Sequence, residues 1–226
     1  KVLEYISANP NPQLELGINT NLGVDDIFID KLIVLANDLI SNNKIKSLNL
    51  YTSVESFGEQ AEYIRDGMIF SQWWENMQLL HENDIDTHCM MTINALCLET
   101  LPDLVDMIMN KRIEYGNRRF AIMSFNILRF PSFQSPLVLP DELRNKFKLN
   151  LVKFLSNNEK YLEHMEVNQV QRLIDYLDVV KTPHAGAAEQ SKLQKDFKAF
   201  YSQYDKRSGK DFVKTFPIIG EWYRGI

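Results

Sequence analysis

The sequence predicts an α/β fold, in which parallel strands alternate with helices, followed by a helical C-terminal part. Three observations carry this prediction. Apolar, strand-like segments alternate with amphipathic helical segments four times before Pro140. The strand segments begin roughly 30 to 40 residues apart, which is the length of a β/α unit with a right-handed crossover. After Pro140 only amphipathic helical segments follow.

The first β/α unit has a strand over 14–18 that ends in the polar tip Asn19, Thr20 and Asn21. Asp25 is placed to cap the helix that follows, because its carboxylate can accept hydrogen bonds from N–H groups of the first turn. Apolar residues of this helix recur at helical spacing, which predicts one buried stripe. The stripe consists of Ile29, Leu32, Ile33, Ala36 and Leu39.

The other three units repeat this pattern. Strands are predicted over 47–53, at about 87–93 and at about 120–128. The helix after the second strand begins at about Phe70, and at least one ring of its Trp73–Trp74 pair should pack against the sheet. The helix after the third strand buries Leu101, Leu104, Val105 and Ile108.

We interpret residues 1–140 as a partial (β/α) barrel and residues 141–226 as a helical extension packed on it. Four units are too few to close an eight-stranded barrel, so we expect the first strands of the barrel before Lys1. In the extension, helices are predicted over 141–157, 164–180 and 189–205. A loop is predicted over 183–188, and the apolar tail 212–223 is expected to dock on the rest of the chain.

Composition narrows the classes of function. The chain has 226 residues, 45% hydrophobic residues and a net charge of −5, which favours a globular protein and disfavours nucleic acid as a partner. No apolar run reaches about 20 residues, so no membrane span is expected. The two cysteines, Cys89 and Cys97, are interpreted as buried free thiols of a cytoplasmic protein. The four histidines show no metal-ligand spacing.

The strongest candidate site lies in the segment 48–67, LNLYTSVESFGEQAEYIRDG. A buried strand here leads to Ser53 and Glu55, and a short helix after Gly58 delivers Arg65. In α/β proteins, ligands bind at the carboxyl ends of the strands. A carboxylate accepts hydrogen bonds from sugar hydroxyls and a guanidinium pairs with a carboxylate. The competing interpretation is a surface ion pair or a helix cap.

Polar residues also end the other predicted strands. Asn21, Thr92, Asn94 and Asn126 are the candidates at these tips. For the asparagines, turn and capping roles are the favoured interpretation on residue type alone. The aromatic loop 130–133 either walls a pocket or covers the C-terminal helices, and the second role is favoured.

Together these segments resemble the later strands of the radical S-adenosylmethionine (SAM) barrel, with the closest similarity to twitch-domain-containing radical SAM proteins. The segment SxExxGxxxEYIRxG is fairly specific, and the others support it by their order and spacing. The matching segments are LGINTNLG (16–23), YTSVESFGEQAEYIRDG (51–67), MTINAL (91–96), FNILRFPSFQSPLVLP (125–140) and DFKAFYSQYDKRSGKDFVKTFP (196–217).

The resemblance implies a partial (β/α)6 barrel that cleaves SAM reductively to a 5′-deoxyadenosyl radical, which abstracts hydrogen from a peptide or small-molecule substrate. It implies that Ser53 and Glu55 hold the ribose hydroxyls and that Arg65 holds the carboxylate of SAM. Asn21, Thr92, Asn94 and Asn126 would border SAM or the substrate. The family also requires a reductant and a [4Fe-4S] cluster bound by a CxxxCxxC loop, which we expect before Lys1.

Two other functions are compatible with the sequence. One is a catalytically inactive barrel-derived binding or scaffold module, for which the aromatic-rich stretch 196–223 is the candidate surface. The other is an unrelated barrel hydrolase that uses Glu55 or Glu62 as a general base. That chemistry calls for paired carboxylates or a metal triad at the strand ends, where only Glu55 can be placed directly.

Overall fold

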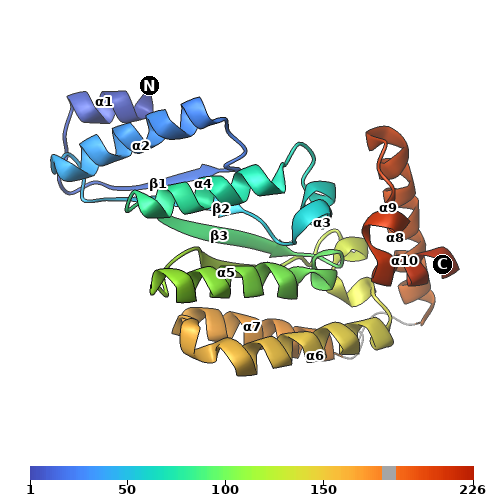
Figure 1. The fold of residues 1–226 in the computed structure, drawn as a ribbon. Coiled ribbons are helices and arrows are strands. Elements are labelled where there is room, and N and C mark those ends of the chain that lie inside the picture. Colours follow the sequence, from blue (N-terminus) through green and yellow to red (C-terminus); the bar gives the residue numbers. More distant parts are fainter. Residues whose placement is uncertain (180–186) are drawn as a thin grey trace.

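The computed structural model describes residues 1–179 and 187–226. Its centre is a sheet of four parallel strands in the order β1-β2-β3-β4 (Figure 1). Neighbours in sequence are therefore neighbours in the sheet, as simple right-handed β/α repetition predicts. The strands are β1 (Glu15–Thr20), β2 (Ser47–Ser53), β3 (Asp86–Ile93) and β4 (Ile122–Ile127).

Helices link the strands and make up the C-terminal part of the chain. Those that precede, link or follow the first three strands are α1 (Val2–Ala8), α2 (Asp26–Ser41), α3 (Gly58–Ile64), α4 (Phe70–Glu82) and α5 (Leu101–Tyr115). Those that follow β4 are α6 (Asp141–Asn158), α7 (His164–Asp178), α8 (Ala187–Ser208), α9 (Phe212–Thr215) and α10 (Pro217–Gly225). No helix within the described residues is both long enough and apolar enough to cross a membrane.

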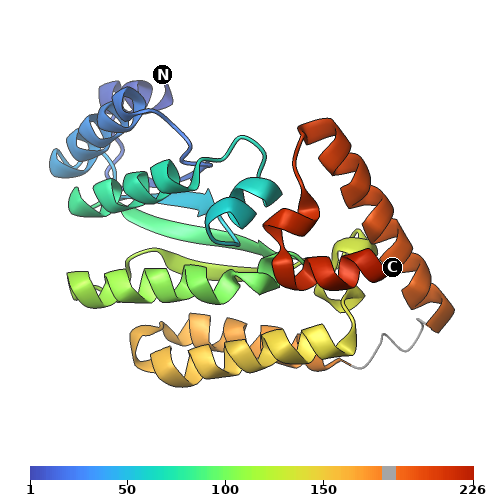
Figure 2. The ribbon, with the colours of Figure 1, turned by 45° about the vertical axis from the view of Figure 1, so that its right-hand side comes forward.

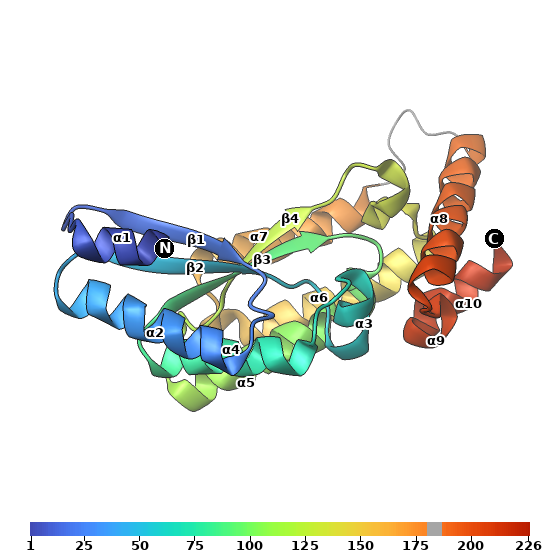
Figure 3. The same cartoon turned by 90° about the horizontal axis from the view of Figure 1, so that it is seen from above.

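One face of the sheet is covered by α2, α4 and α5 (Figure 3). Strand side chains on this face are buried, among them Leu50 on β2, Cys89 on β3 and Met123 on β4. Trp73 of α4 is fully buried there, and its indole N–H donates a hydrogen bond of 3.0 Å to the Thr52 hydroxyl. The hydrophobic core therefore lies between the sheet and these three helices.

The opposite face carries no helix among the described residues, and we call it the helix-free face (Figure 3). Its side chains are mostly polar and partly or fully exposed: Asn19, Asn49, Tyr51, Ser53, Asp86, His88, Thr92, Ser124 and Asn126. The Tyr51 and His88 rings stack across β2 and β3 with centroids 4.9 Å apart. Parallel sheets are normally buried on both faces, so an exposed polar face marks the side from which a ligand or further chain can approach.

The outer edge of β4 is closed by α7. The backbone N–H groups of Met123 and Phe125 donate to Glu166 Oε1 at 2.7 Å and to Gln169 Oε1 at 2.6 Å. Arg172 donates to the Phe125 carbonyl oxygen. Residues three apart share one face of a helix, so three side chains of α7 replace the neighbouring strand. No further strand can pair with β4 at these positions.

A buried ion pair fixes α7 against α5 and the sheet. Both Arg112 and Glu166 have side chains with 0% exposure, and two hydrogen bonds of 2.7 Å join them. Arg112 also donates to the carbonyl oxygens of Phe120, Ala121 and Tyr161. Every charge of the pair is thereby matched by several hydrogen-bond partners, which is what allows it to be buried.

The sequence predictions for the elements hold closely. Asp25 caps α2 through a 2.9 Å hydrogen bond from the Phe28 N–H, and the predicted stripe of α2 is buried except for Leu32, which is partly buried. Of the predicted loop 183–188, residues 183–186 lie outside the described residues, as does residue 180 of the predicted helix. Ala187 and Ala188 belong to α8, so the loop prediction is wrong there, in keeping with the high helix propensity of alanine.

We predict that Arg112→Met lowers the free energy of unfolding by about 3–5 kcal/mol, because it leaves Glu166 buried without a compensating charge. Urea unfolding followed by circular dichroism measures this loss. Lys111→Met on the same helix is the matched control, since it removes a pair with the exposed Glu114 and a cation–π contact with Tyr115, and it leaves no buried charge without a partner. Equal effects of the two substitutions would contradict the role assigned to the buried pair.

Candidate ligand site at the carboxyl edge of the sheet

The predicted convergence of Glu55 and Arg65 is present. β2 ends at Ser53, and Glu55 follows two residues later. Gly58, with φ of +56°, begins α3 in a backbone conformation that favours glycine, and α3 ends directly before Arg65. The Arg65 Nε and Nη2 atoms both lie 2.7 Å from Glu55 Oε2. The turn between β2 and α3 thus folds a guanidinium back onto a strand-end carboxylate.

Glu55 is much more buried than a surface ion pair would be. Only 4% of the residue is exposed, while 30% of the Arg65 side chain remains accessible. Burial raises the pKa of the Glu55 carboxyl above its ordinary value of 4.5, and the charge and hydrogen bond of Arg65 oppose this shift. The carboxylate is therefore poorly solvated and gains from each further hydrogen-bond donor.

Both partners keep unused hydrogen-bonding capacity. Within the described residues, Glu55 Oε1 accepts no hydrogen bond and Arg65 Nη1 donates none. A guanidinium has five N–H donors, so Arg65 can hold Glu55 and a second anion together. The pair consequently presents one acceptor and one cationic donor group at the edge of the sheet.

Ser53, Thr92 and Asn126 lie on the helix-free face near the same edge. Thr92 and Asn126 are register partners on β3 and β4, and both are exposed. Ser53 pairs in register with Met90, two residues before Thr92, and is partly buried. None of these three side chains forms a hydrogen bond with another described residue. They are therefore free to contact a ligand above the ends of β2, β3 and β4.

The asparagines Asn21 and Asn94 stabilise turns. Asn21 Oδ1 accepts a 3.1 Å hydrogen bond from the Gly23 N–H. Asn94 Oδ1 accepts from the Leu96 and Cys97 N–H groups at 2.8 and 3.3 Å. These are the turn and capping roles that the residue types favour. Contact of either side chain with a ligand remains a prediction.

The two cysteines are enclosed in the core. Burial raises the pKa of the Cys89 thiol to about 12 and the pKa of the Cys97 thiol well above its ordinary value of 9.0. The Cys97 thiol donates to the Thr92 carbonyl oxygen at 3.7 Å. Among the described residues, no group of three or more His, Cys, Asp or Glu side chains is arranged to hold a metal ion.

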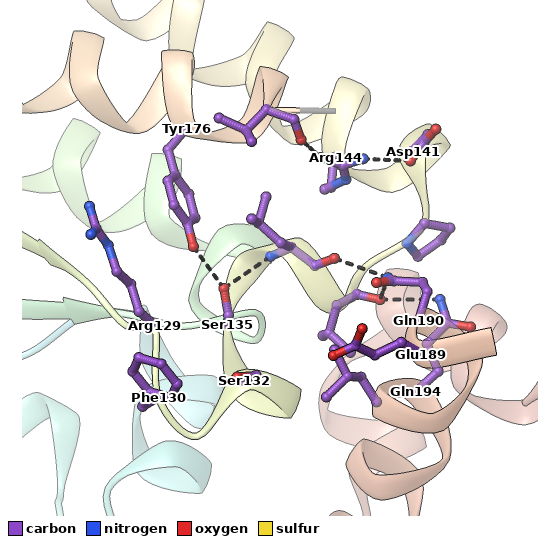
Figure 4. A pocket seen from close by; sticks show the side chains of 15 residues that line it. Arg129, Phe130, Ser132, Ser135, Asp141, Arg144, Tyr176, Glu189, Gln190 and Gln194 are labelled. Atoms are coloured by element: carbon purple, nitrogen blue, oxygen red, sulfur yellow. Dashed lines mark hydrogen bonds and ion pairs between the residues drawn. The ribbon is translucent and has the colours of Figure 1, made fainter. Parts of the chain in front are cut away.

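A cavity of about 720 Å³ lies apart from the Glu55–Arg65 pair, between the loop after β4, the end of α7 and the start of α8 (Figure 4). Its polar lining is largely paired internally: the Ser135 and Tyr176 hydroxyls are 3.1 Å apart, and Gln190 donates to the Leu137 and Val138 carbonyl oxygens. Of its walls, only the aromatic loop 130–133 was indicated by the sequence, because the other walls come from segments distant in the chain.

The aromatic loop 130–133 takes both roles considered for it. Phe130 is 80% exposed and lines the cavity (Figure 4). Phe133 instead packs on Phe200 of α8, with ring centroids 5.3 Å apart. The loop therefore walls the cavity through Phe130 and Ser132 and covers the C-terminal helices through Phe133.

We predict that Arg65→Met raises the pKa of Glu55 further, because the guanidinium is what opposes the effect of burial. A carbon-13 NMR titration of the glutamate carboxyl carbons measures it. An unchanged or lowered pKa of Glu55 in this variant would contradict the assignment.

The same group makes stability depend on pH. Since its folded-state pKa lies above 4.5, the folded protein holds this proton more tightly than the unfolded chain does. We therefore predict that the contribution of Glu55 to the free energy of unfolding falls as the pH rises from about 4.5 through the folded-state pKa. Glu55→Gln should remove this part of the slope in urea unfolding measured across that range.

We predict that neither thiol reacts with Ellman's reagent in the folded protein, because both are buried and protonated at neutral pH. In urea both should react. A thiol that reacts rapidly without denaturant would show that the core around β3 opens to solvent.

Comparisons with known proteins give no further information on the function of this site. Comparisons of the chain with protein-family models, with curated proteins and with solved structures find no match. The functional interpretation therefore depends on the sequence resemblance and on the arrangement of Glu55, Arg65 and the neighbouring strand ends.

Proposed function

We propose that this chain is the later-strand part of a radical SAM enzyme and supplies one half of its SAM pocket. In this proposal Glu55 accepts hydrogen bonds from the ribose hydroxyls, the Ser53 hydroxyl bonds the same ribose, and Arg65 pairs with the carboxylate of SAM. The single observation that carries the proposal is the pair of a buried Glu55 and an accessible Arg65 at the carboxyl edge of a parallel sheet, with one acceptor and one donor group unused.

The donor set fits SAM at its two polar ends. A carboxylate beside a hydroxyl suits a vicinal diol, because carboxylate oxygens accept hydrogen bonds from both of its hydroxyls. The accessible Arg65 suits a carboxylate through charge-assisted hydrogen bonds. Thr92 and Asn126, exposed at the next two strand ends, offer further polar contacts, and Asn21 and Asn94 are proposed to border SAM or the substrate.

The described residues do not fit the iron–sulfur cluster. Cys89 and Cys97 are both buried, and no metal-binding group exists among the described side chains. We therefore expect the cluster ligands outside this chain and assign no step of the radical chemistry to its residues. The role proposed for them is to bind and orient SAM.

A partial barrel is part of the same proposal. Helices lie on one face of the sheet (Figure 3). The opposite face carries mostly polar side chains, as the interior of a ligand-binding barrel would. The edge of β4 is closed by α7. Within the described residues β1 pairs only with β2, so further strands of a barrel would join at β1.

The alternatives gain less from the structure. For a scaffold module, the aromatic side chains of 196–223 are mainly buried, with Phe197, Phe212 and Phe216 at 0% exposure. For a hydrolase, Glu62 is occupied as an acceptor for the Phe70 N–H at 2.9 Å, which leaves Glu55 without a second acid. A SAM half-site gives a role to Ser53, Glu55 and Arg65 together, which neither alternative does.

We predict that the chain binds SAM and that Arg65→Ala and Glu55→Ala each weaken binding about tenfold to a hundredfold, which corresponds to about 1.5–3 kcal/mol for hydrogen bonds to charged groups. Isothermal titration calorimetry measures the dissociation constants. Glu15→Ala is the control, because its exposed pair with Lys46 lies at the opposite end of the strands. SAM affinity unchanged in both site variants would remove the assignment.

A second test addresses the enzyme class. The coding sequence before Lys1 should contain a CxxxCxxC segment within about 150 residues, roughly one domain length. The full polypeptide, reconstituted anaerobically with iron and sulfide, should cleave SAM under reductant. Absence of the cysteine segment would argue against the proposal, even if the chain bound SAM.

A further inference from the structure

The position of Arg65 depends on how α3 ends. Arg65 is the residue directly after α3, and its N–H donates to the Ala61 carbonyl oxygen at 2.9 Å. α3 has only seven residues, and an isolated helix of that length is not stable in water. The carbonyl groups of its last turn need partners from outside the helix. Whatever supplies those partners also determines the direction in which the chain leaves α3.

The partners come from the turn between α8 and α9 and from the end of α8. Lys210 Nζ donates to the Glu62 carbonyl oxygen at 2.8 Å and to Asp66 Oδ1 at 2.9 Å, so it holds the chain on both sides of Arg65. The Tyr204 hydroxyl donates to the Tyr63 carbonyl oxygen at 2.8 Å. Figures 1 and 2 both show α3 beside α9, at the end of the sheet where β2 and β3 finish.

The turn that carries Lys210 is itself held in place. Asp205 accepts from the Phe212 N–H at 2.9 Å and from the Tyr63 hydroxyl at 2.6 Å, so one carboxylate joins the turn to α3. Gly209, with φ of +69°, ends α8 in the left-handed conformation. The Tyr63 ring packs among aromatic side chains of α8 and the residues after it: Tyr201, Tyr204, Phe212 and Phe216.

The charge and contacts of Lys210 suit it to cap the C-terminal end of α3. Burial acts against its charged form, but hydrogen bonds with Asp66 and Tyr204 raise its pKa above the ordinary value of 10.5. The ammonium also lies 5.8 and 5.5 Å from the ring centroids of Tyr63 and Tyr204. It is therefore charged at neutral pH and donates hydrogen bonds to the last turn of α3, to Asp66 and to the Tyr204 hydroxyl.

We propose that Lys210 is a positioning residue, which sets where the Arg65 guanidinium meets the carboxylate of its ligand. This inference rests on the proposed function of Arg65 and adds the residue that acts through it. Ser53 ends β2 and Glu55 follows it before α3 begins, so Lys210 forms no hydrogen bond with the residues assigned to the ribose. Loss of Lys210 should therefore weaken binding of the carboxylate end of SAM and leave binding of its nucleoside unchanged.

The test compares two ligands on three variants of the chain. SAM carries the carboxylate, and 5′-methylthioadenosine has the same nucleoside without it. Lys210→Met keeps the aliphatic stem and loses the donors, and Lys210→Arg restores donors. Lys214→Met is the matched control, because Lys214 on α9 is exposed and forms no hydrogen bond through its side chain with the described residues. Calorimetry gives the affinities, and urea unfolding gives the stability of each variant.

We expect Lys210→Met to weaken SAM binding about tenfold, because a displaced Arg65 guanidinium no longer has the orientation that its hydrogen bonds to the SAM carboxylate require. The affinity for 5′-methylthioadenosine should stay within about twofold, Lys210→Arg should recover most of the SAM affinity, and Lys214→Met should bind both ligands like the wild type. In the absence of ligand, the NMR signal of the Arg65 Nε–H, which is bonded to Glu55, should shift in Lys210→Met only.

Two results would overturn the inference alone: unchanged SAM affinity in Lys210→Met, or an equal loss for both ligands accompanied by a lower unfolding midpoint, which is the result of a purely structural role. Failure of the wild-type chain to bind either ligand would overturn the proposed function and, with it, this inference. The two failures are thus distinguished by the wild-type titration.

Discussion

The buried pair of Arg112 and Glu166 joins α5, α7 and the start of β4 in a region shielded from solvent, where each charge is costly unless its hydrogen bonds are complete. Glu166 meets this condition by accepting from Arg112, from the Met123 N–H and from the Glu163 N–H that begins α7. One carboxylate therefore starts a helix, neutralises a cation and ends a sheet.

Closure of the sheet at β4 gives the candidate site its form. With α7 along that edge and helices on one face, the remaining face and the carboxyl ends of the strands are where polar side chains gather. The Glu55–Arg65 pair lies at the carboxyl ends of the strands. It is supported from the C-terminal part of the chain by α8 and by the turn between α8 and α9. Residues separated by about 150 positions thus act on one guanidinium, and the short helix α3 connects them.

The features that could be predicted from the sequence are those that depend on residues close together in the chain. Strand ends, the Asp25 cap and the approach of Arg65 to Glu55 all follow from periodicity and from a ten-residue segment that must turn back on itself. The replacement of a fifth strand by Glu166, Gln169 and Arg172 carries no local pattern, because any polar helix face offers the same residue types. The Lys210 cap could not be predicted either, and of the cavity beside Tyr176 only the wall formed by the loop 130–133 could be, since both features join segments that are far apart in the sequence.

The side chains of α7 on β4 have a consequence for self-association. Fibrils built by strand addition require two unpaired edges in every molecule, one to receive a neighbour and one to recruit the next. Here two backbone N–H groups at the β4 edge already donate to side chains of α7. A strand that is added at the β1 edge therefore cannot be followed by a second one at β4. The protein is thereby guarded against open-ended cross-β polymerisation, whichever chain comes to lie against its first strand.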